Sequence, residues 1–158
     1  MTSVYFFKLT EKTEYDKTLL PQNVQHHCTK KESIAAATEL LNMGVTGLYY
    51  KQNKPFADNC FVSISHSGDM VAVCTSDKPI GIDIEKIDRE RDLGKIANRF
   101  YHGKELEEFK KNPTADLFFE IWTKKEAYSK IGGEGVGEVF KGFDAYSLED
   151  YVFETERI

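Results

Sequence analysis

The hydrophobic pattern of the chain changes its period near Gly81. Before this glycine, short segments rich in β-branched residues are separated by turn-forming Gly, Asn, Asp and Pro, which is typical of β-strands. After it, apolar residues recur three and four positions apart, as they do in amphipathic helices. Mostly strands before this glycine and mostly helices after it indicate an α+β fold. We therefore expect one domain over residues 1–158, with an N-terminal half over 1–80 and a C-terminal half over 81–158.

Turn residues and helix-capping residues set the expected bounds of the individual elements. Strands are predicted at residues 3–9, 48–51, 60–65, 70–75 and 80–85, with weaker strand signals at 139–143 and 151–156. Helices are predicted at residues 33–43, 92–100 and 104–111, and from Pro113 to near Ile131. The first of these helices follows a capping-box pattern at Thr29 and Glu32, and the last follows Asn112, a good N-cap residue.

Charge and cysteine content limit the expected partners and compartment. The chain has 21 Lys and Arg against 26 Asp and Glu, and a net charge of −5 disfavours nonspecific binding to nucleic acid or anionic lipid. Its first twelve residues lack the apolar core of a signal peptide, and no segment reads as a membrane span. Three cysteines without paired spacing fit free thiols in a reducing compartment. We expect a cytoplasmic protein with no nucleic-acid or membrane partner.

Strict alternation over residues 81–85 places two acidic side chains on one face of the predicted strand. Ile82 and Ile84 point to one side, and Asp83 and Glu85 point to the other. Repulsion between two such carboxylates raises a pKa in a half-buried site unless a cation compensates. A hard divalent ion such as Mg²⁺ suits ligands that are all oxygen. On this segment alone, a solvated polar strand face remains the simpler interpretation.

A third carboxylate falls on the apolar face of the long C-terminal helix. At about 100° per residue, Glu126 lies between Trp122 and Phe119, so we expect it to face inward. A buried carboxylate must be neutralised, paired or bound to a metal ion. Lys125 falls in the same apolar arc, and Lys130 follows Glu126 by one helical turn. Three carboxylates and two lysines describe a site for Mg²⁺ and phosphate, although a buried Glu–Lys ion pair explains the helix as well.

Several segments resemble motifs of the 4′-phosphopantetheinyl transferase superfamily. Residues 80–86, Ile-Gly-Ile-Asp-Ile-Glu-Lys, and residues 122–130, Trp-Thr-Lys-Lys-Glu-Ala-Tyr-Ser-Lys, look like its signature pair. Residues 63–68, Ser-Ile-Ser-His-Ser-Gly, are similar to the Asn-hydrophobic-Ser-His-Ser motif of its long, surfactin-synthetase-activating branch, with Ser63 in place of Asn. The resemblance covers about half the chain, roughly residues 54–137, and the chain looks like a shortened member of that branch.

This resemblance implies a fold, an activity and partners. The expected fold has two similar α+β halves with the cleft between them, the C-terminal sheet being shortened here. The expected enzyme is Mg²⁺-dependent and moves the 4′-phosphopantetheine arm of coenzyme A to a serine of an apo acyl or peptidyl carrier protein, releasing adenosine 3′,5′-bisphosphate. A monomer is expected, with a dimer as the alternative if a second copy covers an open sheet edge. A coenzyme A or nucleotide-binding module without turnover and a metal-dependent nuclease stay open as other functions.

The resemblance also implies which residues hold the metal ion and move the proton. Asp83, Glu85 and Glu126 are expected to hold Mg²⁺ against the pyrophosphate of coenzyme A. Glu126, or a water molecule that it orients on the ion, is the expected base, and Glu105 is the alternative. A solvated helix glutamate is an equally simple interpretation of Glu105.

Contacts to the phosphates of coenzyme A are implied for five other residues. Lys125 and Lys130 are expected to neutralise phosphate charge, Lys130 as part of the catalytic machinery. Ser65 and His66 are expected to contact the coenzyme phosphates, His66 at the 3′-phosphate. Lys54 matches a lysine that lies by the coenzyme in the family.

Overall fold

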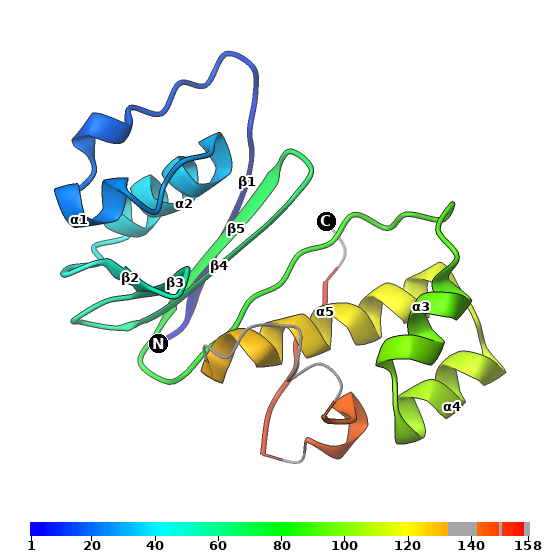
Figure 1. The fold of residues 1–158 in the computed structure, drawn as a ribbon. Coiled ribbons are helices and arrows are strands. Elements are labelled where there is room, and N and C mark those ends of the chain that lie inside the picture. Colours follow the sequence, from blue (N-terminus) through cyan, green and yellow to red (C-terminus); the bar gives the residue numbers. More distant parts are fainter. Residues whose placement is uncertain (133–141, 149, 157–158) are drawn as a thin grey trace.

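The protein, seen here as a computed structural model, is described over residues 1–132, 142–148 and 150–156 (Figure 1). A three-stranded antiparallel sheet has the order β1 (Ser3–Lys8), β5 (Met70–Ser76), β4 (Phe61–Ser67), and a hairpin pairs β2 (Tyr49–Lys51) with β3 (Lys54–Phe56). The helices are α1 (Gln22–Gln25), α2 (Lys31–Asn42), α3 (Leu93–Phe100), α4 (Gly103–Lys111) and α5 (Ala115–Gly132), with 3-10 turns η1 (Lys17–Leu19) and η2 (Ala145–Ser147). No helix among these residues is both long and apolar enough to cross a bilayer.

Helix α2 covers one face of the three-stranded sheet (Figure 1). Ala36 and Ala37 of α2 are buried in the cluster that the helix forms with the sheet. Leu40 of α2 packs with Val71 and Val73 of β5, and all three side chains are fully buried. This apolar contact forms the core of the N-terminal half.

A second, aromatic core lies among α3, α4 and α5, on the other side of the sheet from α2 (Figure 1). The rings of Tyr101, Phe109 and Phe118 lie 5.3–6.0 Å apart between centroids, in stacked and edge-to-face pairs. The Tyr101 hydroxyl donates a hydrogen bond of 2.7 Å to the Phe118 carbonyl, which satisfies its buried polar end. The two cores confirm the α+β class.

Most predicted elements are present, with corrections at their ends. The strands predicted at 3–9, 48–51, 60–65 and 70–75 are β1, β2, β4 and β5. Strand β3 was not predicted, because its sequence region carries the turn-forming residues Asn53 and Pro55. The actual turn is formed by Gln52 and Asn53, whose φ angles of 49° and 65° are left-handed, and Pro55 lies in the short strand that follows.

The helices begin at other capping residues than predicted. Helix α2 begins at Lys31, and the Ser33 hydroxyl accepts the Lys30 N–H at 3.2 Å, where the sequence predicted capping from Thr29. Helix α5 begins at Ala115, and the Thr114 hydroxyl accepts the Leu117 N–H at 3.3 Å. The cap of α5 is therefore Thr114 and not Asn112.

The strand predicted at 80–85 is wrong in one respect, because this segment does not join a sheet. It runs extended between the sheet and α5 (Figure 1). Residues 151–156 form no strand either, and most of the segment predicted at 139–143 lies outside the described residues. In the described part of the C-terminal half all regular elements are helical, so a second sheet resembling the first is not seen there.

Helix α5 crosses the extended segment at Gly81. A Cβ atom on Gly81 would overlap the carbonyl oxygen of Ala127 and lie 3.2 Å from Cγ1 of Ile131. Only glycine permits this approach. The contact brings the residues that follow Gly81 close to the middle of α5.

We predict that Gly81→Ala destabilises the protein. The added methyl group must push α5 away from the extended segment, which costs about 1–3 kcal/mol for an overpacked contact. Gly132→Ala is the matched control, because a Cβ there meets no atom of the described residues within 4 Å. Urea unfolding followed by Trp122 fluorescence should show a lower midpoint for Gly81→Ala and an unchanged or higher one for Gly132→Ala. Equal midpoints would contradict the close approach.

Candidate functional site

The Lys130 ammonium of α5 lies in a cluster of oxygen atoms from the extended segment and β4. It donates hydrogen bonds to Asp83 Oδ1 at 2.6 Å, to Ser65 Oγ at 2.9 Å and to the Ile82 carbonyl at 3.0 Å. An ammonium has three donors, so these bonds use its whole capacity. The Asp83 side chain is 5% exposed, so the ion pair with Lys130 is largely shielded from water. Lys130 therefore links α5 to the extended segment through Asp83 and to the sheet of the N-terminal half through Ser65.

Asp83 keeps one acceptor that nothing among the described residues uses. Its Oδ1 also accepts the Ser65 hydroxyl at 2.8 Å, while its Oδ2 is buried and has no hydrogen-bond partner in the described part of the chain. A buried carboxylate oxygen without a donor is costly. The free oxygen is thus a point where a cation or a donor from a ligand would be stabilising.

Glu126 lies near Asp83 and is strongly affected by its surroundings. Burial, followed by the negative charge of Asp83 and then of Glu85, raises the pKa of Glu126 to about 7, while Lys130 acts against this shift. Desolvation and Asp83 also raise the pKa of Glu85, opposed by a hydrogen bond from Ser67. Asp83, Glu85 and Glu126 therefore influence one another electrostatically.

As placed, these carboxylates do not form a chelate. Within the described residues, no three His, Cys, Asp or Glu side chains lie together in a way that would hold a metal ion. The three carboxylates nevertheless suit a hard cation, because every atom they could offer as a metal ligand is an oxygen. Asp83 Oδ2 also has no hydrogen-bond partner among the described residues.

Lys125 and Glu105 form a separate ion pair inside the helical core. Lys125 Nζ donates to Glu105 Oε1 at 2.5 Å and to the Phe143 carbonyl at 2.5 Å, and both charged side chains are fully buried. Burial lowers the pKa of Lys125, and Glu105 opposes this shift. Glu105 also accepts the N–H groups of His102 at 3.0 Å and Ala145 at 2.7 Å.

This geometry does not support the substrate roles expected for Lys125 and Glu105. A lysine that neutralises phosphate and a base that takes a proton must both touch the substrate. Neither side chain has exposed surface, and each is engaged within the protein. The pair instead fastens residues 143–145 onto α4 and α5. The interpretation of Glu105 as a solvated glutamate is also wrong, because it is buried and paired.

Of the three residues expected at the coenzyme phosphates from the N-terminal half, only Ser65 lies in the Lys130 cluster. His66 is the next residue on β4, so its side chain is exposed on the other face of the strand. Lys54 donates to the Ile131 carbonyl, one of the unpaired carbonyls at the C-terminus of α5. Lys54 therefore attaches the end of α5 to the β2–β3 hairpin.

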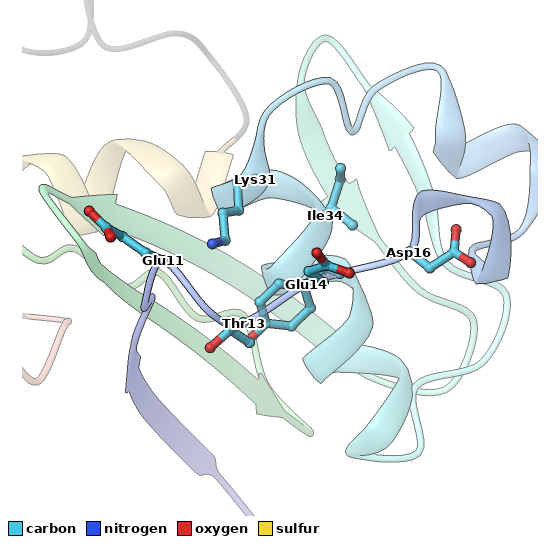
Figure 2. Close-up of a pocket in the computed structure, with 7 residues that line it drawn as sticks. Glu11, Thr13, Glu14, Asp16, Lys31 and Ile34 are labelled. Atoms are coloured by element: carbon cyan, nitrogen blue, oxygen red, sulfur yellow. The ribbon is translucent and has the colours of Figure 1, made fainter.

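A surface pocket lies away from these residues, against α2 and the segment that follows β1. Figure 2 shows Lys31 and Ile34 of α2 and the acidic residues Glu11, Glu14 and Asp16 among the residues that line it. The pocket has a volume of about 680 Å³. Its three carboxylates make it unsuited to phosphate groups. The Lys31 ammonium donates to the Thr10 carbonyl at 2.6 Å and is not free to offset them.

The model of one known protein family matches the C-terminal half. Residues 79–155 match the family model of the 4′-phosphopantetheinyl transferase superfamily. Over this range the chain is similar to that superfamily. The match includes Asp83, Glu85, Glu126 and Lys130, so the resemblance noted in the sequence is confirmed.

Curated members of the superfamily also match across both halves. The chain is 39% identical over 105 residues to 4′-phosphopantetheinyl transferase gsp of Aneurinibacillus migulanus, covering 62% of this chain and 44% of that protein. It is 38% identical over 91 residues to psf-1 of Bacillus pumilus, covering 56% and 38%. It is 32% identical over 105 residues to Sfp of Bacillus subtilis strain 168, covering 65% and 46%. The chain thus spans less than half the length of these relatives.

We predict that Lys125→Ala is far more destabilising than Lys124→Ala. Removing Lys125 leaves the Glu105 charge buried and unpaired, which costs about 3–5 kcal/mol. Lys124 pairs with Glu120 at 2.7 Å where solvent reaches both, and such a pair contributes about 0–1 kcal/mol. Urea unfolding of the two variants measures the difference. Similar losses would show that the Lys125 and Glu105 pair is not the structural contact described here.

We also predict that Glu126→Gln stabilises the protein in buffer containing EDTA at pH 8. The raised pKa of Glu126 means that its ionised form opposes folding above about pH 7. Because Glu126 is partly exposed, screening limits the gain to about 1 kcal/mol, or about 2–4 °C in Tm. At pH 4 Glu126 is protonated in both folded and unfolded chains, so the gain should vanish. A lower Tm for the variant at pH 8 would contradict the repulsion.

Proposed function

We propose that this protein transfers the 4′-phosphopantetheine arm of coenzyme A to a serine of an apo acyl or peptidyl carrier protein. The observation that carries the proposal is the meeting of Asp83, on the extended segment, with Glu126 and Lys130 of α5. These residues lie in the range that is similar to a superfamily whose matched members are named 4′-phosphopantetheinyl transferases. Acidic and basic groups together at one place are what transfer of a charged phosphoryl group requires.

Asp83, Glu85 and Glu126 are the residues that would hold Mg²⁺. Their oxygen-only donor set and the unsatisfied Asp83 Oδ2 support this assignment. When bound, the ion would neutralise the pyrophosphate of coenzyme A and make its phosphorus more electrophilic. Lys130 is the cation already present at the site, and its side chain is 25% exposed, whereas that of Lys125 is enclosed. Its hydrogen bonds are made within the protein, so it would stabilise negative charge on the same phosphates through its own charge.

The proposed reaction is one displacement at the β-phosphorus of coenzyme A. The carrier serine oxygen forms a new bond to this phosphorus, and the bond to the bridging oxygen of the pyrophosphate breaks. Adenosine 3′,5′-bisphosphate leaves with that oxygen, and the serine proton passes to a base. Glu126 is the base we propose, since it lies beside Asp83 and Lys130 and is partly exposed, whereas Glu105 is enclosed.

The proposal is tested by incubating the protein with coenzyme A, Mg²⁺ and a panel of apo acyl and peptidyl carriers. Intact-mass spectrometry should show one carrier gaining a single phosphopantetheine arm, and EDTA should abolish the gain. Coenzyme binding in isothermal titration without any carrier modification would favour a binding module without turnover. Mg²⁺-dependent cleavage of plasmid DNA or RNA would favour a nuclease instead.

We predict that Glu126→Gln lowers the transfer rate by about 10²–10⁴-fold, the usual contribution of a positioned base. Glu120→Gln is the matched control, because Glu120 lies on the same helix and pairs only with Lys124 in the contacts described above. Initial rates by mass spectrometry and circular dichroism of both variants separate loss of chemistry from loss of fold. Full activity of Glu126→Gln would remove Glu126 from the mechanism.

A further inference from the structure

Three serines of β4 hold the extended segment through their hydroxyl groups. Ser63, Ser65 and Ser67 alternate along the strand, so their side chains share the face that points away from α2. Each hydroxyl oxygen accepts the backbone N–H of the residue 19 positions later. The distances are 3.1 Å to Ile82, 3.3 Å to Ile84 and 3.0 Å to Lys86. We call these three serines the hydroxyl ladder.

Two rungs of the hydroxyl ladder also donate to the acidic side chains. Ser65 donates to Asp83 Oδ1 at 2.8 Å, and Ser67 donates to Glu85 Oε2 at 3.0 Å. A serine hydroxyl has one donor and two acceptor sites, so one side chain can perform both tasks. At the first rung the corresponding residue is Gly81, where α5 makes its close approach.

The hydroxyl ladder sets which residues of the segment face the site. A shift of one residue in an extended segment exchanges its two faces. Such a shift would bring Ile82 and Ile84 to the positions of Asp83 and Glu85. The extended segment does not pair with a strand. The three serine contacts therefore connect it to the sheet at regular intervals.

We propose that Ser67 is a positioning residue that fixes the Glu85 carboxylate beside Asp83 for binding a divalent cation. This inference rests on the proposed function and adds a residue to it. Ser65 already contacts Lys130, whereas Ser67 contacts the segment alone in the hydrogen bonds described here. Ser67 is also the rung that holds the end of the segment farthest from Gly81.

The first measurement is amide hydrogen exchange in the metal-free protein. In Ser67→Ala the Lys86 amide should exchange about tenfold faster, since its acceptor is gone, while the Ile82 amide is unchanged. Ser67→Thr keeps the hydroxyl and should restore the slow exchange. Ser76→Ala is the matched control, because Ser76 Oγ accepts the Lys78 N–H at 3.1 Å on another strand. An unchanged exchange rate of the Lys86 amide in Ser67→Ala would show that Ser67 does not hold the segment, and would contradict the proposal.

The second measurement is binding of Mn²⁺, a paramagnetic substitute for Mg²⁺, followed by electron paramagnetic resonance. Ser67→Ala should weaken binding about tenfold, Ser67→Thr should restore it, and Ser76→Ala should leave it unchanged. Equal affinity of Ser67→Ala and the unmodified protein would overturn the positioning role, as would no binding by the unmodified protein. If Mn²⁺ binding follows the expected order but no carrier is modified, the proposed function fails and the positioning role stands.

Discussion

The ion pair between Lys130 and Asp83 is the contact on which the arrangement of the site depends. It joins a helix of the second half to a segment that lies on the sheet of the first. Two other contacts act at nearby points of α5: Gly81 lets the helix approach at Ala127, and Lys54 binds the Ile131 carbonyl. Because these three contacts lie within about one turn of helix, the position of Glu126 relative to Asp83 is strongly determined.

Helix α5 is buried on two sides, and this explains why its two lysines differ. Lys125 faces the aromatic core and pairs with Glu105, while Lys130 faces the sheet and pairs with Asp83. Five residues correspond to about 500°, so the two side chains point about 140° apart. A helical projection shows which residues of α5 face the interior of the protein. It cannot show that two of these residues face different cores. The sequence therefore predicted one site for two lysines that serve separate contacts.

The helices and strands were predictable where turn and capping residues give a local signal. The site was predictable where the period of the side chains determines which residues share a face. Alternation over residues 81–85 correctly placed Asp83 and Glu85 on one side, even though the segment is not a sheet strand. The alternating serines at 63, 65 and 67 were visible in the sequence, but their partners 19 residues away were not. Contacts of this kind depend on how the chain folds back, and a single sequence carries no local signal for that.

Holding the acidic segment by hydroxyls has a geometric consequence that backbone pairing would not have. A strand paired with β4 would extend the sheet sideways and carry Asp83 and Glu85 along with its edge. Bound to serine side chains, the segment instead lies over the face of β4, between the sheet and α5. Asp83 is then enclosed by Ser65 and Lys130 and keeps one unsatisfied oxygen. The same hydroxyls that hold the backbone thus keep Asp83 and Glu85 close together against their mutual repulsion.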